Sequence, residues 1–151
     1  MSEDKPNILI VDQERFSSLI TKMLSGRYSV ETAIDGPSAV RALSEGQPNV
    51  VVAEEGVGGI RLAELIGMST KYGHVPVILT SAKPSPDTII KSQNAGISTF
   101  LAKPFRPSEL ISRIDSALKE QVAEESFEAS QVSEEEKREQ PTSIKDRVKQ
   151  I

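Results

Sequence analysis

Polar residues follow several short apolar runs of this chain, and their side chains limit the chemistry available to it. The chain contains no cysteine and one histidine. A thiol nucleophile, a disulfide framework and a cysteine-based zinc or iron–sulfur site are therefore excluded, and most histidine metal sites are disfavoured. The remaining candidates carry carboxylates, an amide, hydroxyls and an ammonium group: Asp12, Gln13, Glu54, Glu55, Thr80, Ser81 and Lys103.

Alternating apolar runs and amphipathic segments are expected to position these residues. Five runs are predicted to be strands, at residues 8–11, 28–33, 50–53, 75–79 and 98–102. The segments between and after them carry apolar residues at helical spacing, which predicts core-facing helix sides. Those residues are Phe16, Leu19, Ile20, Met23 and Leu24; Val40 and Leu43; Leu62, Leu65 and Ile66; and Leu110, Ile111, Ile114 and Leu118.

This alternation predicts an α/β fold, a doubly wound five-stranded parallel sheet with helices on both faces. Right-handed crossovers and the short chain favour an open sheet over a closed barrel. In such sheets the binding site lies at the carboxyl ends of the strands. All the polar candidates named above fall at those ends, so we expect them to share one edge of the sheet.

The domain is predicted to span residues 1–120, with residues 121–151 as a charged tail or linker. All nine glycines lie at or before Gly96, and a polar stretch rich in Glu and Lys follows the last helix. That stretch cannot build a core of its own. It is either a solvated, partly helical linker or a signalling helix, since Ile144, Val148 and Ile151 follow a helical spacing.

Charge and hydropathy narrow the classes of partner. The chain has 18 basic and 22 acidic residues, a net charge of −4, which disfavours a nucleic-acid surface. No apolar run approaches the length of a membrane span, and the first residues lack the pattern of a signal peptide. We therefore expect a soluble cytoplasmic protein without nucleic-acid or membrane partners.

Four segments carry a family resemblance: residues 8–14, 48–54, 76–82 and 96–105. In this order and at these spacings they resemble the response-regulator receiver domain of two-component signalling, over about residues 6–120. The resemblance implies a (βα)5 flavodoxin-like fold. It also implies a cis peptide bond between Lys103 and Pro104.

The receiver site uses acyl-phosphate chemistry, in which an aspartate takes a phosphoryl group beside Mg²⁺ and a lysine binds a phosphate oxygen. The resemblance assigns six positions in this chain. They are the acidic pair Asp12 and Gln13, the phosphoacceptor position Glu54, the phosphate-binding Lys103, the switch hydroxyl Ser81 and the switch aromatic Phe100. Asp12 and Glu54 would be the metal ligands.

Four departures from the family pattern surround the reaction centre. Glu54 replaces the aspartate and carries its carboxylate about 1.5 Å further out, which is too far for in-line attack to tolerate. Gln13 offers a neutral amide where the family has a carboxylate, so no cofactor is expected and any Mg²⁺ binding is weakened. Glu55 adds a charge at a position that is usually apolar, and the connection from Glu54 to Gly59 is shorter than the family's loop.

We therefore predict an atypical pseudo-receiver, not an enzyme, that acts as a protein-interaction module. The alternatives are a functional phosphoacceptor response regulator that binds Mg²⁺ and, less favoured, a small flavodoxin-like enzyme. The expected partners are a histidine kinase or a downstream output module. A homodimer is also open, through the face of the fourth helix, fifth strand and fifth helix, where Ile89, Lys91, Gln93, Arg106, Arg113 and Lys119 are expected.

The roles of individual residues stay open at this point. The Glu54 carboxylate could imitate a phosphorylated aspartate toward Lys103 and Ser81, or it could form an ion pair with Lys103 that only stabilises the pocket. The Ser81 hydroxyl could be a switch or could satisfy backbone groups. Phe100 could be a switch or a core residue.

Overall fold

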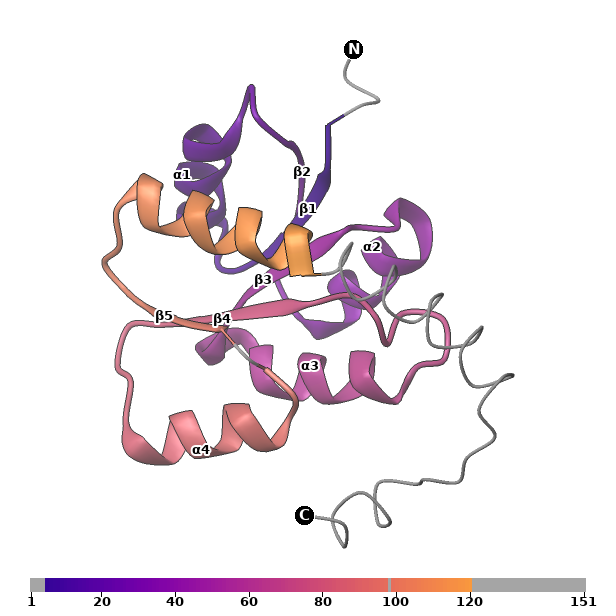
Figure 1. The fold of residues 1–151 in the computed structure, drawn as a ribbon, viewed down its shortest axis with the longest axis vertical. Helices are drawn as coiled ribbons and strands as arrows, with labels where there is room; N and C mark the ends of the chain where they lie inside the picture. The colour runs from indigo at the N-terminus through magenta and orange to yellow at the C-terminus, as the bar shows by residue number, and fades with distance from the viewer. Residues whose placement is uncertain (1–4, 98, 121–151) are drawn as a thin grey trace, which may run out of the picture. The chain divides into compact units, whose positions relative to one another are not determined.

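The computed structural model describes residues 5–97 and 99–120. Five strands form one parallel sheet in the order β2-β1-β3-β4-β5. Their bounds are Asn7–Val11 for β1, Ser29–Ala33 for β2, Val50–Glu54 for β3, Val77–Ser81 for β4 and Thr99–Ala102 for β5. The predicted doubly wound α/β fold is confirmed (Figure 1).

Helices cover both faces of this sheet. The helices are α1 at Glu14–Leu24, α2 at Gly36–Gly46, α3 at Gly59–Met68 and α4 at Pro86–Asn94, with a short 3₁₀ turn, η2, at Glu55–Val57. A last described helix covers residues 107–120. In Figure 1 this last helix lies beside α1 on one side of the sheet, and α3 and α4 lie on the other.

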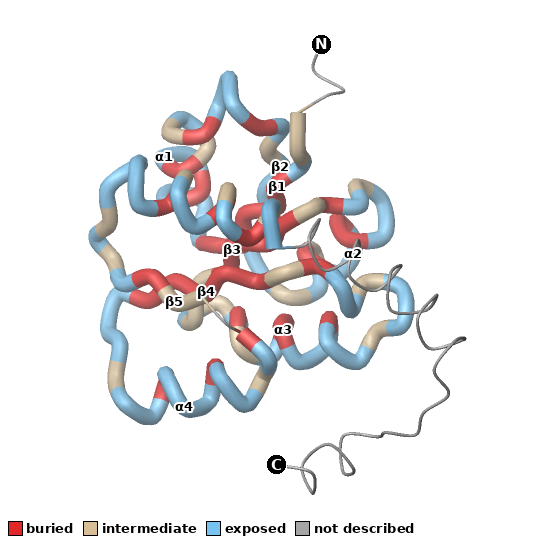
Figure 2. The backbone as a smooth tube through the Cα atoms, in the orientation of Figure 1, coloured by how far each residue is buried: buried red, intermediate tan, exposed pale blue. Residues whose placement is uncertain are grey.

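The hydrophobic core forms two clusters, one on each face of the sheet. One cluster joins alternate strand residues to α2 and α3, and the other joins the intervening residues to α1 and the last helix. Val50, Val51 and Val52 are all buried because β3 is central and is covered on both faces. This explains why the inner strands are continuous apolar runs, and Figure 2 shows them as the buried centre of the fold.

The helices bury narrower faces than the apolar spacing predicted. Helix α1 buries Ser17, Ile20 and Leu24, whereas Phe16 is 39% exposed and Leu19 is 51% exposed. Val40 in α2 and Leu65 in α3 are also exposed. The physical reason is that a helix lying on a flat sheet buries one stripe, so the apolar positions that flank this stripe remain in solvent.

The predicted strand boundaries were wrong at both ends of β4 and at the carboxyl end of β3. Strand β4 begins after Pro76, which has no N–H to donate to the ladder, although its carbonyl accepts a hydrogen bond from Val51 N at 3.0 Å. The strand then continues through Thr80 and Ser81, and β3 includes Glu54, which pairs with Thr80. Glu54, Thr80 and Ser81 therefore belong to the strands, whereas Asp12, Glu55 and Lys103 directly follow the ends of β1, β3 and β5.

The predicted tail at residues 121–151, with the spacing of Ile144, Val148 and Ile151, lies outside the described residues. Within the described part of the chain, no helix has the length and apolar character needed to cross a membrane.

Candidate functional site

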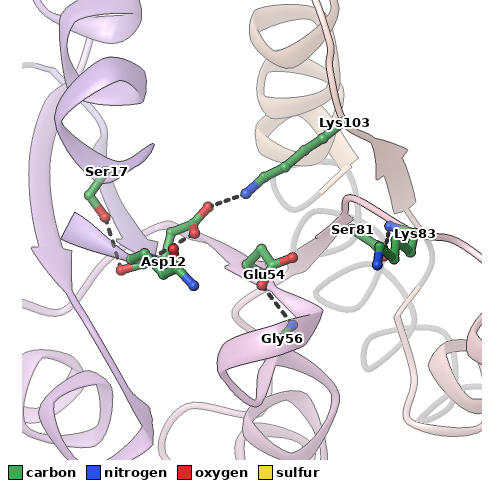
Figure 3. A network of polar contacts seen from close by, with 8 residues as sticks. Asp12, Ser17, Glu54, Gly56, Ser81, Lys83 and Lys103 are labelled. Atoms are coloured by element: carbon green, nitrogen blue, oxygen red, sulfur yellow. Dashed lines mark hydrogen bonds and ion pairs between the residues drawn. The ribbon is translucent and has the colours of Figure 1, made fainter. Parts of the chain in front are cut away.

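The parallel register brings the polar candidates to one edge of the sheet. Val11 of β1 pairs with Ala53 of β3, so Asp12 and Glu54 follow at neighbouring strand ends. On the other side, Ser81 of β4 pairs with Ala102 of β5, which precedes Lys103. Figure 3 shows the side chains of Asp12, Glu54, Ser81 and Lys103 at this edge.

Asp12 and Lys103 form a buried ion pair. The Lys103 Nζ lies 2.8 Å from Asp12 Oδ2, and their side chains are 10% and 3% exposed. The other carboxylate oxygen, Oδ1, accepts a hydrogen bond from Gln13 N at 2.7 Å, and the Ser17 hydroxyl donates to the Asp12 carbonyl. Both carboxylate oxygens of Asp12 are thus engaged within the protein.

Phe16 is a site residue that the sequence pattern assigned to the core. The Lys103 ammonium lies 3.8 Å from the centroid of its ring, a cation–π contact. The ring comes from the first turn of α1. The available sequence signal was its position four residues after Asp12, at the start of the helix.

Glu54 does not contact Lys103. Its Oε1 atom accepts a hydrogen bond from Gly56 N at 2.7 Å, within its own turn (Figure 3). Among the ion pairs of residues 5–97 and 99–120, none joins Glu54 to Lys103. The expected stabilising pair is therefore wrong, because Asp12 already neutralises the lysine and the turn N–H holds the glutamate.

The carboxylate that reaches Ser81 belongs to Glu55. The Ser81 hydroxyl donates to Glu55 Oε1 at 2.7 Å, and the Thr88 hydroxyl donates to Glu55 Oε2 at 2.8 Å. The sequence pattern identified Glu55 only as an added charge and did not identify Thr88. The shortened connection after β3 was the one sequence signal of this contact.

The remaining candidates differ in their surroundings. Phe100 is half-buried and packs against the core cluster that faces α2 and α3, while Gln13 is exposed. Thr80 is buried, and its hydroxyl has no hydrogen-bond partner among the described residues. The Lys103–Pro104 peptide bond is cis, as the resemblance implied.

The donor set of this edge does not suit Mg²⁺. The Asp12 oxygens are engaged by Lys103 and by a backbone N–H, one Glu54 oxygen accepts from Gly56, and Gln13 supplies a neutral, exposed amide. Mg²⁺ requires near-octahedral oxygen ligands, usually including carboxylates. No group of three or more acidic, histidine or cysteine side chains that could hold a metal occurs in the described residues.

An apolar groove lies next to the ion pair. Its volume is about 420 Å³, and its walls come from α1, from Ala82 after β4 and from the segment that follows β5. The exposed rings and aliphatic chains of Phe16 and Leu19 contribute to it, together with Phe105. The polar edge is therefore bordered by a surface that could accept apolar side chains of another protein.

Comparison with known proteins gives a family match over most of this chain. The family model of the response regulator receiver domain matches residues 8–115. The transcriptional regulatory protein PrrA of Mycobacterium tuberculosis is 30% identical over 122 residues, covering 76% of this chain and 50% of PrrA. Hybrid signal transduction histidine kinase D of Dictyostelium discoideum is 28% identical over 115 residues, covering 74% of this chain and 7% of the kinase.

Solved structures agree with this match. The signal receiver domain of an HD domain-containing protein from Pseudomonas fluorescens has a TM-score of 0.73 and 27% identity, covering 79% of this chain and 98% of that chain. NtrX from Brucella abortus has a TM-score of 0.75 and 25% identity, covering 83% of this chain and 29% of that chain. The chain spans 50% of the length of PrrA and 7% of the length of hybrid signal transduction histidine kinase D.

Proposed function

Because this chain belongs to the response regulator receiver domain family, we propose that it serves two-component signalling as an atypical receiver, a protein-interaction module that is not phosphorylated at Glu54. One observation carries the proposal. The Glu54 carboxylate, at the phosphoacceptor position, is bonded to Gly56 N at 2.7 Å and is one methylene longer than aspartate. This bond turns the carboxylate into its own turn, and the longer side chain would start an attack on a phosphoryl group from the wrong distance.

The surroundings of Glu54 support the same proposal. A phosphoryl group carries negative charge that must be neutralised during transfer. The Lys103 ammonium is already paired with Asp12 and covered by Phe16, and no group of carboxylates gathers around a metal position within residues 5–97 and 99–120. Charge neutralisation at this edge would therefore require breaking existing contacts.

Intact-mass measurement tests this proposal directly. The chain is incubated with acetyl phosphate and MgCl₂, beside a receiver that has aspartate at the corresponding position. We expect no gain of mass for this chain and a gain for the control receiver. A stable, Mg²⁺-dependent gain of one phosphoryl group would contradict the proposal. If a Gln13→Asp, Glu54→Asp variant gains this mass, the lack of phosphorylation in the wild-type chain is due to the residues at these two positions.

A working phosphoacceptor is the second candidate, and one observation favours it. Asp12 and Lys103, two positions that match the family's site, remain in contact at 2.8 Å. If this candidate is correct, the wild-type chain is labelled, and Lys103→Ala abolishes the labelling because the lysine would bind a phosphate oxygen.

The partners are proposed to be signalling proteins, a histidine kinase or a downstream output module, or a second copy of the chain. The proposed contact surface is the face of α4, β5 and the last helix. Its six named residues are all exposed: Ile89, Lys91, Gln93, Arg106, Arg113 and Lys119. Basic side chains on this face favour an acidic partner surface.

Charge reversal on this face provides the test. A Lys91→Glu, Lys119→Glu variant should bind such a partner more slowly and more weakly, with the difference shrinking at high salt. Sedimentation velocity of the same variant tests self-association. Partner binding that is equal for the variant and the wild type would count against this surface.

A further inference from the structure

The carboxylate of Glu55 joins three elements of the fold. Glu55 begins the η2 turn after β3, and each of its carboxylate oxygens accepts one hydrogen bond from a hydroxyl group. Ser81 ends β4 and is 1% exposed, while Thr88 lies in the first turn of α4 and is 6% exposed. Hydrogen bonds from hydroxyls to a carboxylate are charge-assisted and about twice as strong as neutral ones.

Each of the two hydroxyls already donates its one proton in this arrangement. Ser81 Oγ accepts a hydrogen bond from Lys83 N at 3.2 Å, and Thr88 Oγ1 accepts one from the Ser85 hydroxyl at 3.1 Å. A hydroxyl has one proton to donate, and both donate it to Glu55. Any other anion that approached Ser81 would therefore have to displace the Glu55 carboxylate.

The same network fixes the start of α4. Ser85 is the N-cap of this helix, and its hydroxyl oxygen accepts a hydrogen bond from Thr88 N at 3.1 Å. The N-cap is thus linked through Thr88 to Glu55. The Lys83 backbone, inside the β4–α4 connection, is linked through Ser81 to the same carboxylate.

The short connection after β3 places Glu55 where it can do this. Glu54 turns its carboxylate to Gly56 and ends the strand, so the next residue begins η2 directly. Gly58 adopts a left-handed conformation with a φ of 94°, which lets α3 begin at the next residue. The two adjacent glutamates therefore have separate roles, one within its own turn and one toward α4.

We propose that Glu55 is a built-in anionic ligand of the β4–α4 connection, holding Ser81 and Thr88 so that the position of α4 does not depend on a phosphoryl group. This inference rests on the proposed function, in which Glu54 takes no phosphoryl group. Its consequence is that the exposed surface of α4, with Ile89 and Ile90, is presented to partners in one constant arrangement.

Amide hydrogen exchange of α4 tests the role of Glu55. The variants are Glu55→Ala, Glu55→Gln and the matched control Glu54→Gln, all in the full chain. We expect Glu55→Ala to speed exchange in residues 86–94 by about tenfold or more, because two charge-assisted hydrogen bonds are lost. Glu55→Gln should have a smaller effect and Glu54→Gln none. Exchange of the β1 amides should not change in any of them.

The inference is overturned if α4 exchanges in Glu55→Ala at the wild-type rate, or if the β1 amides speed up equally. Should Glu55→Ala fail to fold, Thr88→Val removes the contact from the other side. It should also speed α4 exchange, and the Glu55→Gln, Thr88→Val double variant should show less than the sum of the two single effects. Additive effects would show that the two residues are not coupled and would overturn the inference.

A phosphodonor arm separates this inference from the proposed function. The wild-type chain is treated with acetyl phosphate and MgCl₂, and both its mass and its α4 exchange are followed. A gain of phosphoryl mass with unchanged α4 exchange contradicts the proposed function but supports the role of Glu55. A change in α4 exchange that accompanies the mass gain overturns the role of Glu55 as well.

Discussion

Lys103 is held by an ion pair, a cation–π contact and a backbone hydrogen bond. Its ammonium bonds to the Asp12 carboxylate and lies over the Phe16 ring, while its backbone N–H donates to the Ser81 carbonyl at 2.8 Å. The ion pair is almost fully shielded from water. A charge in such a place must keep its partner, because the loss of water around it is compensated only by the pair.

Replacing Lys103 with methionine should therefore destabilise the fold. Lys103→Met leaves the buried Asp12 carboxylate without its cation, and we expect a loss of about 3–5 kcal/mol in the free energy of unfolding. Urea unfolding followed by circular dichroism measures it. The control is the Asp12→Asn, Lys103→Met double variant, which removes both charges and should recover most of the loss. A double variant that is no more stable than Lys103→Met would contradict this explanation.

At the scale of elements, the start of α3 is packed directly against the end of β3 and the middle of β4. A Cβ added to Gly59 would lie 2.7 Å from Leu79 Cδ1 and 2.9 Å from the Glu54 carbonyl oxygen. The backbone oxygen cannot move without disturbing β3. The short η2 turn, which also positions Glu55, brings the start of α3 this close to the sheet.

Two alanine substitutions in α3 test this packing. Gly59→Ala should lower the free energy of unfolding by about 1–3 kcal/mol through overpacking. Gly67, in the last turn of the same helix, has no atom within 4 Å of an added Cβ. Gly67→Ala should raise stability by up to about 1 kcal/mol through helix propensity. Thermal and urea unfolding measure both changes, and equal effects of the two substitutions would disprove the packing argument.

At the scale of the whole described domain, one polar contact joins residues far apart in the chain. Tyr28 precedes β2, and its hydroxyl donates to Asp115 Oδ1 in the last helix at 2.5 Å. Arg27 binds Asp115 Oδ2 at 2.7 Å. Burial, and then the hydrogen bond to Asp115, raise the pKa of Tyr28 to about 12, while the Arg27 guanidinium opposes the shift.

This raised pKa predicts a loss of stability in alkali. In the unfolded chain Tyr28 ionises near pH 10, whereas the folded chain keeps its proton until about pH 12. The contribution of this pKa difference to the free energy of unfolding is therefore complete below pH 10, and it disappears as the pH rises from about 10 to 12. We expect Tyr28→Phe to flatten this part of the stability profile by about 1–2 kcal/mol. Urea unfolding between pH 9 and 12 measures it, and parallel profiles for both proteins would refute the assignment.

The fold was predictable from the sequence because a parallel strand covered on both faces must be apolar throughout. The valines of β3 and the apolar run of β1 predict such strands, and apolar residues at helical spacing predict the helices. The same logic placed Asp12, Glu54, Ser81 and Lys103 at one edge, since parallel strands end together. It did not resolve that Thr80 and Ser81 are themselves strand residues, because apolar character alone does not mark where a ladder of backbone hydrogen bonds stops.

Which carboxylate meets which partner depended on the folded chain. Asp12, Glu54 and Glu55 carry the same chemical group, and spacing along the chain cannot say which lies within about 3 Å of a given donor. The η2 turn directs Glu54 to Gly56 and Glu55 to Ser81, while α1 brings Phe16 over the lysine that Asp12 binds. The contacts of Glu55 with Ser81 and of Lys103 with Asp12 and Phe16 join elements far apart in sequence, and their geometry depends on how the helices and the sheet pack together.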